Sequence, residues 1–184
     1  MTVLIIEVFA KSQKNLLPDP QKNQIESLFY YFKNSNDEIE TGSILVEKTE
    51  NLKPSLSSYN VEYVVNEADI IFTLIDKVQA WDPDIIGGWD TELGSWGYLA
   101  DRTRIEIGLE LSEEVSRVRS KSHRNIIGTE RWAEMKTTTF TSPGRHVFNV
   151  WRIAKSELSL PQTTLEHVSH KVLKQRWVIF TNFV

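Results

Sequence analysis

The stretch over residues 81–102, WDPDIIGGWDTELGSWGYLADR, constrains the fold of this chain more than any other. Proline fixes its own φ and biases the preceding residue away from the helical region, so Asp-Pro-Asp at 82–84 predicts a sharp turn. The apolar pair before Gly87-Gly88 predicts a short buried strand that ends where the backbone passes close to another group. A polar turn over 90–94 follows, and a helix is expected to start near Ser95.

The helix after this turn carries Trp96, Leu99 and Thr103 on one stripe, at spacings of three and four residues. A strand that stops at glycines and turns into a helix places the helix N-terminus at the edge of a sheet. In open α/β sheets, ligands and phosphates bind at that edge. Strand–turn–helix architecture without any ligand is the alternative interpretation.

The rest of the chain predicts further strands and helices. Extended segments are expected at 2–10, 25–32 (where a helix is the alternative), 42–48 and 59–65, with the first two paired. Asn66, with Asp69 three residues on, predicts a capped helix with an apolar stripe. The later residues predict a strand and turn over 137–145, a helix entered at 148, and a last helix opened by a capping box, Thr163 to Glu166. This order predicts an α/β fold, a mixed sheet flanked by helices.

Length and composition set the outer limits. A chain of 184 residues is expected to form one domain with a real core. The net charge of −4 does not by itself predict nucleic-acid binding, and the absence of cysteine excludes disulfides and thiolate metal sites. No segment has the length of a membrane span or the pattern of a signal sequence, so we expect an intracellular protein. The chain begins directly in a strand, which suggests a fragment of a longer protein.

Glu7 is the one charge within the first predicted strand. Burying a carboxylate in a strand is costly unless it is paired or binds a cation. Two interpretations stay open: a glutamate that is paired with a neighbouring Arg or Lys, or the remnant of a metal site.

Two groups of polar residues require interpretation. Positions 117–124 hold five basic residues, and the DNA-binding candidates among them are Arg117, Arg119, Lys121 and Arg124. This cluster either forms a solvated loop or contacts phosphates. His167 and His170 are three apart on a predicted helix, but without a third ligand they do not predict a metal site.

The pattern DPDII-G-G-W, followed after six residues by W-G-Y-L-x-x-R, resembles the second exonuclease motif of B-family DNA polymerases. Within that family the segment SWGYL over 95–99 is similar to the zeta branch, the translesion polymerases. LLPDP over 16–20 and G-R-x-x-x-N-V-W-R over 144–152 are further points of resemblance. The resemblance extends from residue 3 to about residue 180 and implies a ribonuclease H-like, 3′–5′ exonuclease fold.

The resemblance also implies a degenerate active site. Proofreading relatives carry aspartates where this chain has Ile5, Ser95 and Asn149, so Glu7 is the only retained ligand. Cleavage by this fold uses two divalent metals, which require about four carboxylates. The final carboxylate motif is expected after residue 180 and does not occur before the end of the sequence. We therefore predict no catalytic residue, no bound metal and no cofactor in this chain.

Five other carboxylates lie near the motif and are candidates to replace the missing ligands. Asp90 and Glu92, in the turn, could reach the site, but a flexible turn fixes metal spacing poorly. Asp82 and Asp84 are expected at the opposite strand end, and Asp101 is expected to point away. Ser95 is predicted to be the N-cap of its helix, replacing aspartate without the charge.

The function implied by the resemblance is structural. Residues 1–184 are expected to be an inactive exonuclease-like domain of a larger zeta-type polymerase, without its palm and later domains. This domain would support DNA binding and the polymerase core in error-prone repair synthesis. Implied partners are primer-template DNA, the other polymerase domains and accessory subunits; Mg²⁺ would serve the parent polymerase, and the location would be nuclear. The alternatives are an active metal-dependent 3′–5′ exonuclease and a protein-interaction module that does not contact DNA.

Overall fold

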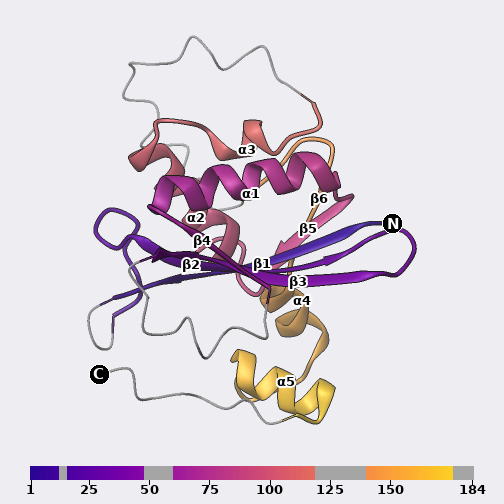
Figure 1. The fold of residues 1–184 in the computed structure, drawn as a ribbon. Coiled ribbons are helices and arrows are strands. Elements are labelled where there is room, and N and C mark those ends of the chain that lie inside the picture. The colour runs from indigo at the N-terminus through magenta and orange to yellow at the C-terminus, as the bar shows by residue number, and fades with distance from the viewer. Residues whose placement is uncertain (13–15, 48–59, 119–139, 176–184) are drawn as a thin grey trace.

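A computed structural model describes residues 1–12, 16–47, 60–118 and 140–175 (Figure 1). Within these ranges a six-stranded mixed sheet has the strand order β4-β3-β2-β1-β5-β6. Its strands are β1 (Val3–Ala10), β2 (Ile25–Lys33), β3 (Ile39–Val46), β4 (Val61–Val64), β5 (Ile85–Gly88) and β6 (His146–Asn149). The predicted α/β class and mixed sheet are confirmed.

The sheet combines an antiparallel half with a parallel half. β1 pairs antiparallel with β2, and β2 with β3, whereas β1–β5, β5–β6 and β3–β4 are parallel. The predicted strand at 25–32 and its pairing with the first strand are therefore confirmed. β3 begins three residues before the predicted start at 42, because a tight turn closes the β2–β3 hairpin: Asn34 donates its N–H to the Glu38 carbonyl, and Asp37 has φ 66°.

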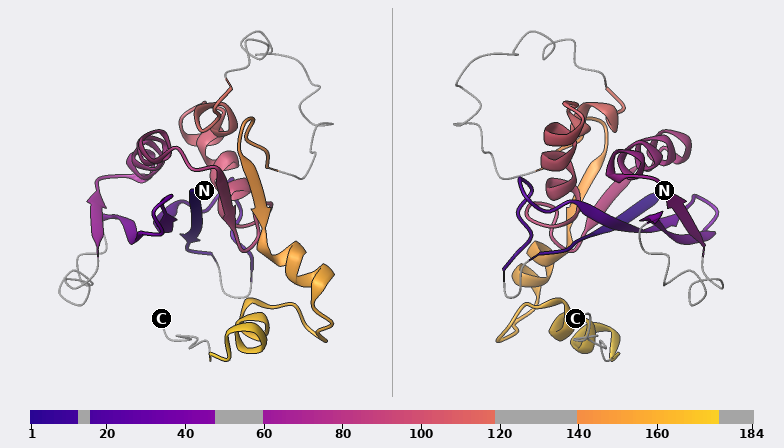
Figure 2. Two further views of the ribbon diagram at one scale, coloured as in Figure 1. Left: turned by 90° about the vertical axis from the view of Figure 1, so that its right-hand side faces the viewer. Right: turned by 60° about the vertical axis from the view of Figure 1, so that its left-hand side comes forward.

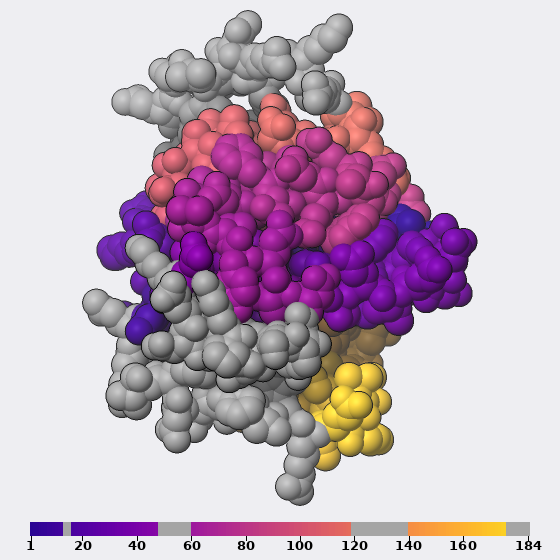
Figure 3. All heavy atoms as spheres, in the orientation of Figure 1, coloured from indigo at the N-terminus to yellow at the C-terminus, as the bar shows by residue number. Residues whose placement is uncertain are grey.

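Helix α1 (Glu67–Trp81) covers one face of this sheet (Figures 1 and 3). Its N-cap is Asn66, whose side chain accepts a hydrogen bond from the Asp69 amide at 2.9 Å, as predicted. The helix buries the apolar residues Ile70, Ile71, Leu74, Ile75 and Val78. Leu4 and Ile6 of β1, both fully buried, belong to the same hydrophobic core. Burial of this apolar stripe is the main stabilising contribution of the helix.

The remaining helices divide between the two sides of the sheet. Helices α2 (Ser95–Glu106) and α3 (Leu111–Glu114) lie on the same side as α1, while α4 (Val150–Glu157) and α5 (Leu165–Leu173) lie on the other side, beyond β6 (Figures 1 and 2). None of the helices in the described ranges is long and apolar enough to span a bilayer.

Two predicted elements near the C-terminal end lie elsewhere. Of the strand and turn predicted over 137–145, the turn is confirmed at 143–145, where the Arg145 amide donates to the Ser142 carbonyl at 3.1 Å. The strand is not found in the described part of that range: 137–139 lie outside it, 140–142 form no regular structure, and the strand is β6, at 146–149. Only 146–149 run alongside β5, while the Ser142 hydroxyl donates to the Val115 carbonyl at 3.1 Å. The threonine-rich composition of 137–141 thus favoured a strand that the tertiary pairing places later.

The helix starts near this end also differ from prediction by one or two residues. α4 begins at Val150 rather than 148, because the Asn149 side chain caps it by accepting the Arg152 amide hydrogen at 3.0 Å. The capping box predicted from Thr163 is wrong, since Thr164 is the N-cap of α5 and accepts from the His167 amide. Both changes leave the capping chemistry intact and move its position.

Candidate functional site

The predicted site lies where the parallel strands β1 and β5 end side by side. Ile5 aligns with Gly87 across this pair, and the Ile5 Cδ1 atom lies 3.1 Å from where a Cβ on Gly87 would be. Because side chains alternate along a strand, Ile5 and Glu7 share one face, as predicted. A hydrocarbon side chain thus occupies the first of the expected ligand positions.

Glu7 is held by a backbone amide rather than by a basic side chain. Its Oε1 atom accepts a hydrogen bond of 2.5 Å from the N–H of Trp89, just beyond β5. Of the two interpretations of Glu7, pairing with an Arg or Lys is not found in the described ranges, where no residue forms an ion pair with it. Burial raises the pKa of Glu7, the Trp89 hydrogen bond acts in the opposite direction, and the nearby Asp90 carboxylate raises it further.

Ser95 is not the N-cap of α2. The N-cap is Gly94, and Ser95 is the first helical residue, 1% exposed, with its hydroxyl donating to the Asp90 carbonyl at 3.3 Å. A Cβ on Gly88 would lie 2.1 Å from the Ser95 Oγ atom, so the serine packs directly against the strand. α2 therefore begins one residue before the predicted start, because the Gly94 carbonyl accepts a hydrogen bond from the Tyr98 amide. Ser95 thus ties the turn to the end of β5.

The turn over 90–94 is fixed by Asp90, not flexible as the sequence suggested. Asp90 Oδ1 accepts from the amides of Glu92 at 3.0 Å and Leu93 at 3.3 Å, and from the Asn149 side-chain amide at 3.4 Å. Glu92 forms an ion pair of 2.6 Å with Arg152. Both carboxylates are thus already engaged within the fold.

These side chains do not match a two-metal ligand set. Two divalent cations need several free carboxylate oxygens, whereas the four predicted positions offer a hydrocarbon, a hydrogen-bonded carboxylate, a buried hydroxyl and a capping amide. Throughout the described ranges no group of three or more His, Cys, Asp or Glu side chains is placed to hold a metal ion.

Comparison with known proteins identifies the family. The sequence matches the profile described as "DNA polymerase family B, exonuclease domain" over residues 1–168. This chain belongs to the B-family DNA polymerase exonuclease domains. Its fold is therefore ribonuclease H-like, and the predicted resemblance is confirmed.

The curated relatives of this B-family exonuclease domain include catalytic subunits of DNA polymerase zeta. The fission-yeast (Schizosaccharomyces pombe) subunit is 32% identical over 181 residues, which is 95% of this chain and 12% of the relative. The human subunit is 27% identical, covering 98% of this chain and 6% of the relative, and that of Saccharomyces cerevisiae is 24% identical, covering 96% and 12%. The chain therefore spans only a small part of the relatives it matches.

The motif that marks this B-family exonuclease domain has structural roles here. Trp96 is fully buried, and its indole N–H donates to the Gly87 carbonyl at 2.9 Å. Gly97 is required by space, because a Cβ there would lie 2.0 Å from the Glu92 carbonyl oxygen. The Tyr98 hydroxyl donates to the Asn23 carbonyl at 2.6 Å, which anchors the β1–β2 loop. These residues thus hold the end of β5 and the turn that follows it in place.

Arg102 extends this anchoring into the core. Its side chain is 4% exposed and pairs with Glu67, also 4% exposed, through Nε–Oε1 at 2.8 Å and a second contact from Nη2. Its Nη1 atom donates to the Pro20 carbonyl at 2.8 Å, and Glu67 also accepts the Ile25 amide. The arginine thus joins α1, α2 and the β1–β2 loop, which is a role that the sequence did not predict.

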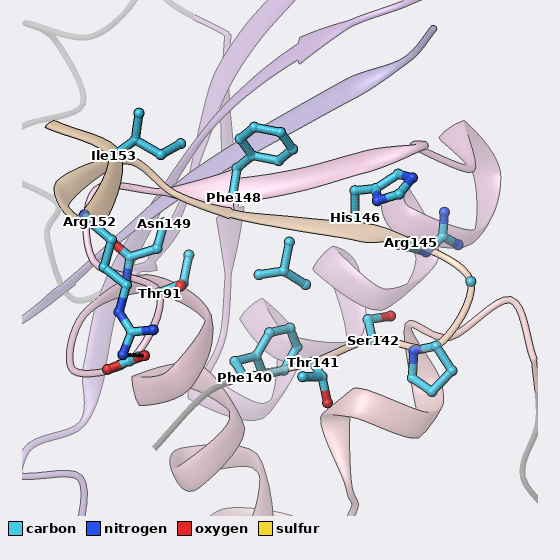
Figure 4. Close-up of a pocket in the computed structure, with 14 residues that line it drawn as sticks. Thr91, Phe140, Thr141, Ser142, Arg145, His146, Phe148, Asn149, Arg152 and Ile153 are labelled. Carbon is cyan, nitrogen blue, oxygen red and sulfur yellow. Dashed lines mark hydrogen bonds and ion pairs between the residues drawn. The ribbon is translucent and has the colours of Figure 1, made fainter. Parts of the chain in front are cut away.

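A hollow of about 610 Å³ lies between β6 and the segment over 140–145 that leads into this strand (Figure 4). Phe140, Thr141 and Ser142 form its floor, and the ion pair of Arg152 with Glu92 closes one end. Asn149 is the one of the four predicted site positions that lines it, and Glu92, a candidate substitute carboxylate, lines it as well. The hollow is thus adjacent to the degenerate site and separate from Glu7.

The predicted basic cluster is only partly within the described residues. Arg117 forms ion pairs with Asp82 at 2.8 Å and Asp84 at 2.9 Å, and Asp82 also pairs with Arg145. These aspartates lie before β5, at the strand end opposite the site, as predicted. Arg119, Lys121 and Arg124 lie outside the described ranges, and DNA contact by this cluster remains a prediction.

The other polar candidates lie away from Glu7. Asp101 is exposed and pairs with Arg104 on α2, in agreement with its predicted orientation. His167 and His170 are both exposed on α5, where the Nδ1 atom of His167 lies 3.1 Å from the Thr164 hydroxyl.

The raised pKa of Glu7 predicts a pH-dependent stability difference. The native state binds this proton more tightly than the unfolded chain, so the free energy of unfolding falls as the pH rises from 4.5 towards the native pKa. Glu7→Gln keeps an acceptor for the Trp89 amide and removes the charge. We expect this variant to gain stability relative to the unmodified chain as the pH rises to neutral, with the pH-dependent part of the difference absent well below pH 4.5.

Thermal denaturation over a series of pH values measures this difference. Glu157→Gln, on the exposed side of α4, is the matched control. A stability difference for Glu7→Gln that stays constant across the series would contradict the expectation.

Proposed function

We propose that this chain is a non-cleaving exonuclease-like domain of a zeta-type translesion DNA polymerase. The proposal rests on the contacts that the residues at the four site positions make in this structure. Glu7 accepts a backbone amide, Ser95 packs against β5, Asn149 caps α4, and Ile5 carries no ligand atom. Three of the four positions thus make contacts within the fold where a nuclease would hold metal, and the fourth is apolar.

Its role is to support DNA binding and the polymerase core during error-prone repair synthesis. Two observations support this role: the family match and the catalytic-subunit relatives, which are many times longer than this chain. A polymerase that extends mismatched or damaged ends has no use for proofreading, which would remove them. The parent would use Mg²⁺ for nucleotidyl transfer in its palm, bind accessory subunits and act in the nucleus.

We assign contact with primer-template DNA to the basic residues that follow Arg117 in the cluster. Arg117 is already engaged with two aspartates that stabilise the start of β5. Arg119, Lys121 and Arg124 follow it directly in the sequence and supply the charge needed to bind phosphates.

A nuclease assay tests the loss of cleavage. The full chain is incubated with end-labelled single-stranded DNA and either Mg²⁺ or Mn²⁺, and we expect no shortened product. Glu7→Ala is assayed in parallel and should behave in the same way. Metal-dependent shortening that disappears in Glu7→Ala would overturn the proposal in favour of a working site around Glu7, Asp90 and Glu92.

A further inference from the structure

The sheet face that carries Glu7 displays aromatic side chains to solvent. Phe9, Phe29 and Phe148 are 50%, 48% and 43% exposed, in contrast to the fully buried Leu4 and Ile6 on the opposite face. The register places Phe29 directly opposite Glu7, and Phe148 beside Gly87. Figure 4 shows Phe148 on the side of β6 away from Phe140. We call Phe9, Phe29, Phe148 and the central Glu7 the aromatic face.

The charge at the centre of the aromatic face is negative and lacks a basic partner among the described residues. Glu7 uses one carboxylate oxygen to accept the Trp89 amide, and Asp90 is close enough to raise its pKa. Both carboxylates keep a second oxygen for which the described residues supply no hydrogen bond. A cation placed here would gain from both carboxylates and from the neighbouring rings.

The occupant that this chemistry favours is a cationic side chain carried on a polypeptide. A guanidinium or ammonium group can pair with Glu7 while its aliphatic stem and apolar neighbours cover the phenylalanines. Single-stranded DNA could also stack on exposed rings, but its phosphates would approach a carboxylate pair that carries no compensating charge. Charge complementarity therefore favours a protein segment over a nucleic acid.

We propose that the aromatic face docks a segment of polypeptide in which an arginine or lysine is flanked by apolar side chains. The segment belongs to the remainder of the parent polymerase, with the basic residue on Glu7 and its apolar neighbours on Phe9 and Phe29. This inference rests on the proposed function, because a site that held metal ions would present positive charge instead.

Peptide binding to the full 184-residue chain tests the proposal. The probes are short overlapping peptides that cover the fission-yeast relative outside the matched region, measured by fluorescence polarisation in the presence of a chelator. We expect peptides with a basic residue between apolar ones to bind, and Glu7→Gln and Phe29→Ala each to weaken that binding by about tenfold or more. Phe72→Ala, an equally exposed phenylalanine on α1 (45%), and Glu157→Gln are matched controls expected to bind normally.

A second binding experiment distinguishes a polypeptide segment from single-stranded DNA as the occupant of the aromatic face. Labelled single-stranded DNA is tested on the same variants: a nucleic-acid site would bind DNA more tightly in Glu7→Gln, since a repulsive charge is removed, and more weakly in Phe29→Ala. That pattern, or the absence of any peptide whose binding depends on both Glu7 and Phe29, overturns the docking proposal. Metal-dependent cleavage in the separate nuclease assay would instead overturn the proposed function.

Discussion

Replacing Arg102 by methionine is expected to lower the free energy of unfolding by about 3–5 kcal/mol. The change leaves the Glu67 carboxylate almost completely buried without its cationic partner and leaves the Pro20 carbonyl without its donor. Removing one member of a buried pair costs far more than the net contribution of the pair, because the remaining charge stays desolvated. Urea denaturation followed by circular dichroism measures the effect.

Two further variants test this explanation. Arg104→Met removes an arginine of the same helix that is 50% exposed and pairs only with surface carboxylates, so a change of at most about 1 kcal/mol is expected. Glu67→Gln combined with Arg102→Met should recover part of the loss, since no uncompensated charge remains. Equal losses in Arg102→Met and Arg104→Met would show that burial of the pair is unimportant.

Truncating Trp96 to alanine is expected to cost about 3–5 kcal/mol. The side chain is fully buried, stacks on Phe140 with ring centroids 5.6 Å apart, and fills the space between α2 and the sheet. The loss combines the transfer free energy of the ring with the cavity that remains. Chemical denaturation of the variant at equilibrium measures it.

Trp96→Phe separates packing from hydrogen bonding. The phenyl ring retains most of the volume but cannot donate to the Gly87 carbonyl, so a smaller loss of about 1–3 kcal/mol is expected. A loss in Trp96→Phe as large as that in Trp96→Ala would indicate that the hydrogen bond, not the packing, dominates.

The sequence predicted the elements whose stabilisation is local. Asn66 lies next to the amide that it caps, and the apolar stripe of α1 follows the helical period, so both follow from neighbouring residues. The run of apolar residues in β1 was equally informative. One local prediction was wrong: Ser95 was expected to be the N-cap of α2. Serine is a good capping residue, but here Gly94 is the N-cap and Ser95 is the first residue of the helix.

The contacts that define the candidate site join residues far apart in the sequence. Glu7 accepts a hydrogen bond from the Trp89 amide, 82 positions away in the sequence. Arg102 donates to the Glu67 carboxylate, 35 positions away. Residue types indicated that Glu7 needs a partner, but several partners were chemically equivalent until the strands were placed side by side. For the same reason the threonine-rich segment before β6 was predicted as a strand.

The anchoring of α2 has a consequence for how exonuclease domains of this kind are recognised. Trp96, Tyr98 and Arg102 hold the strand end, the β1–β2 loop and α1 together through contacts that involve no metal and no substrate. A chain can therefore abandon hydrolysis and still need every one of these side chains to stay folded. A match to this family over the segment is therefore evidence for the fold, whereas hydrolysis depends on the carboxylate positions.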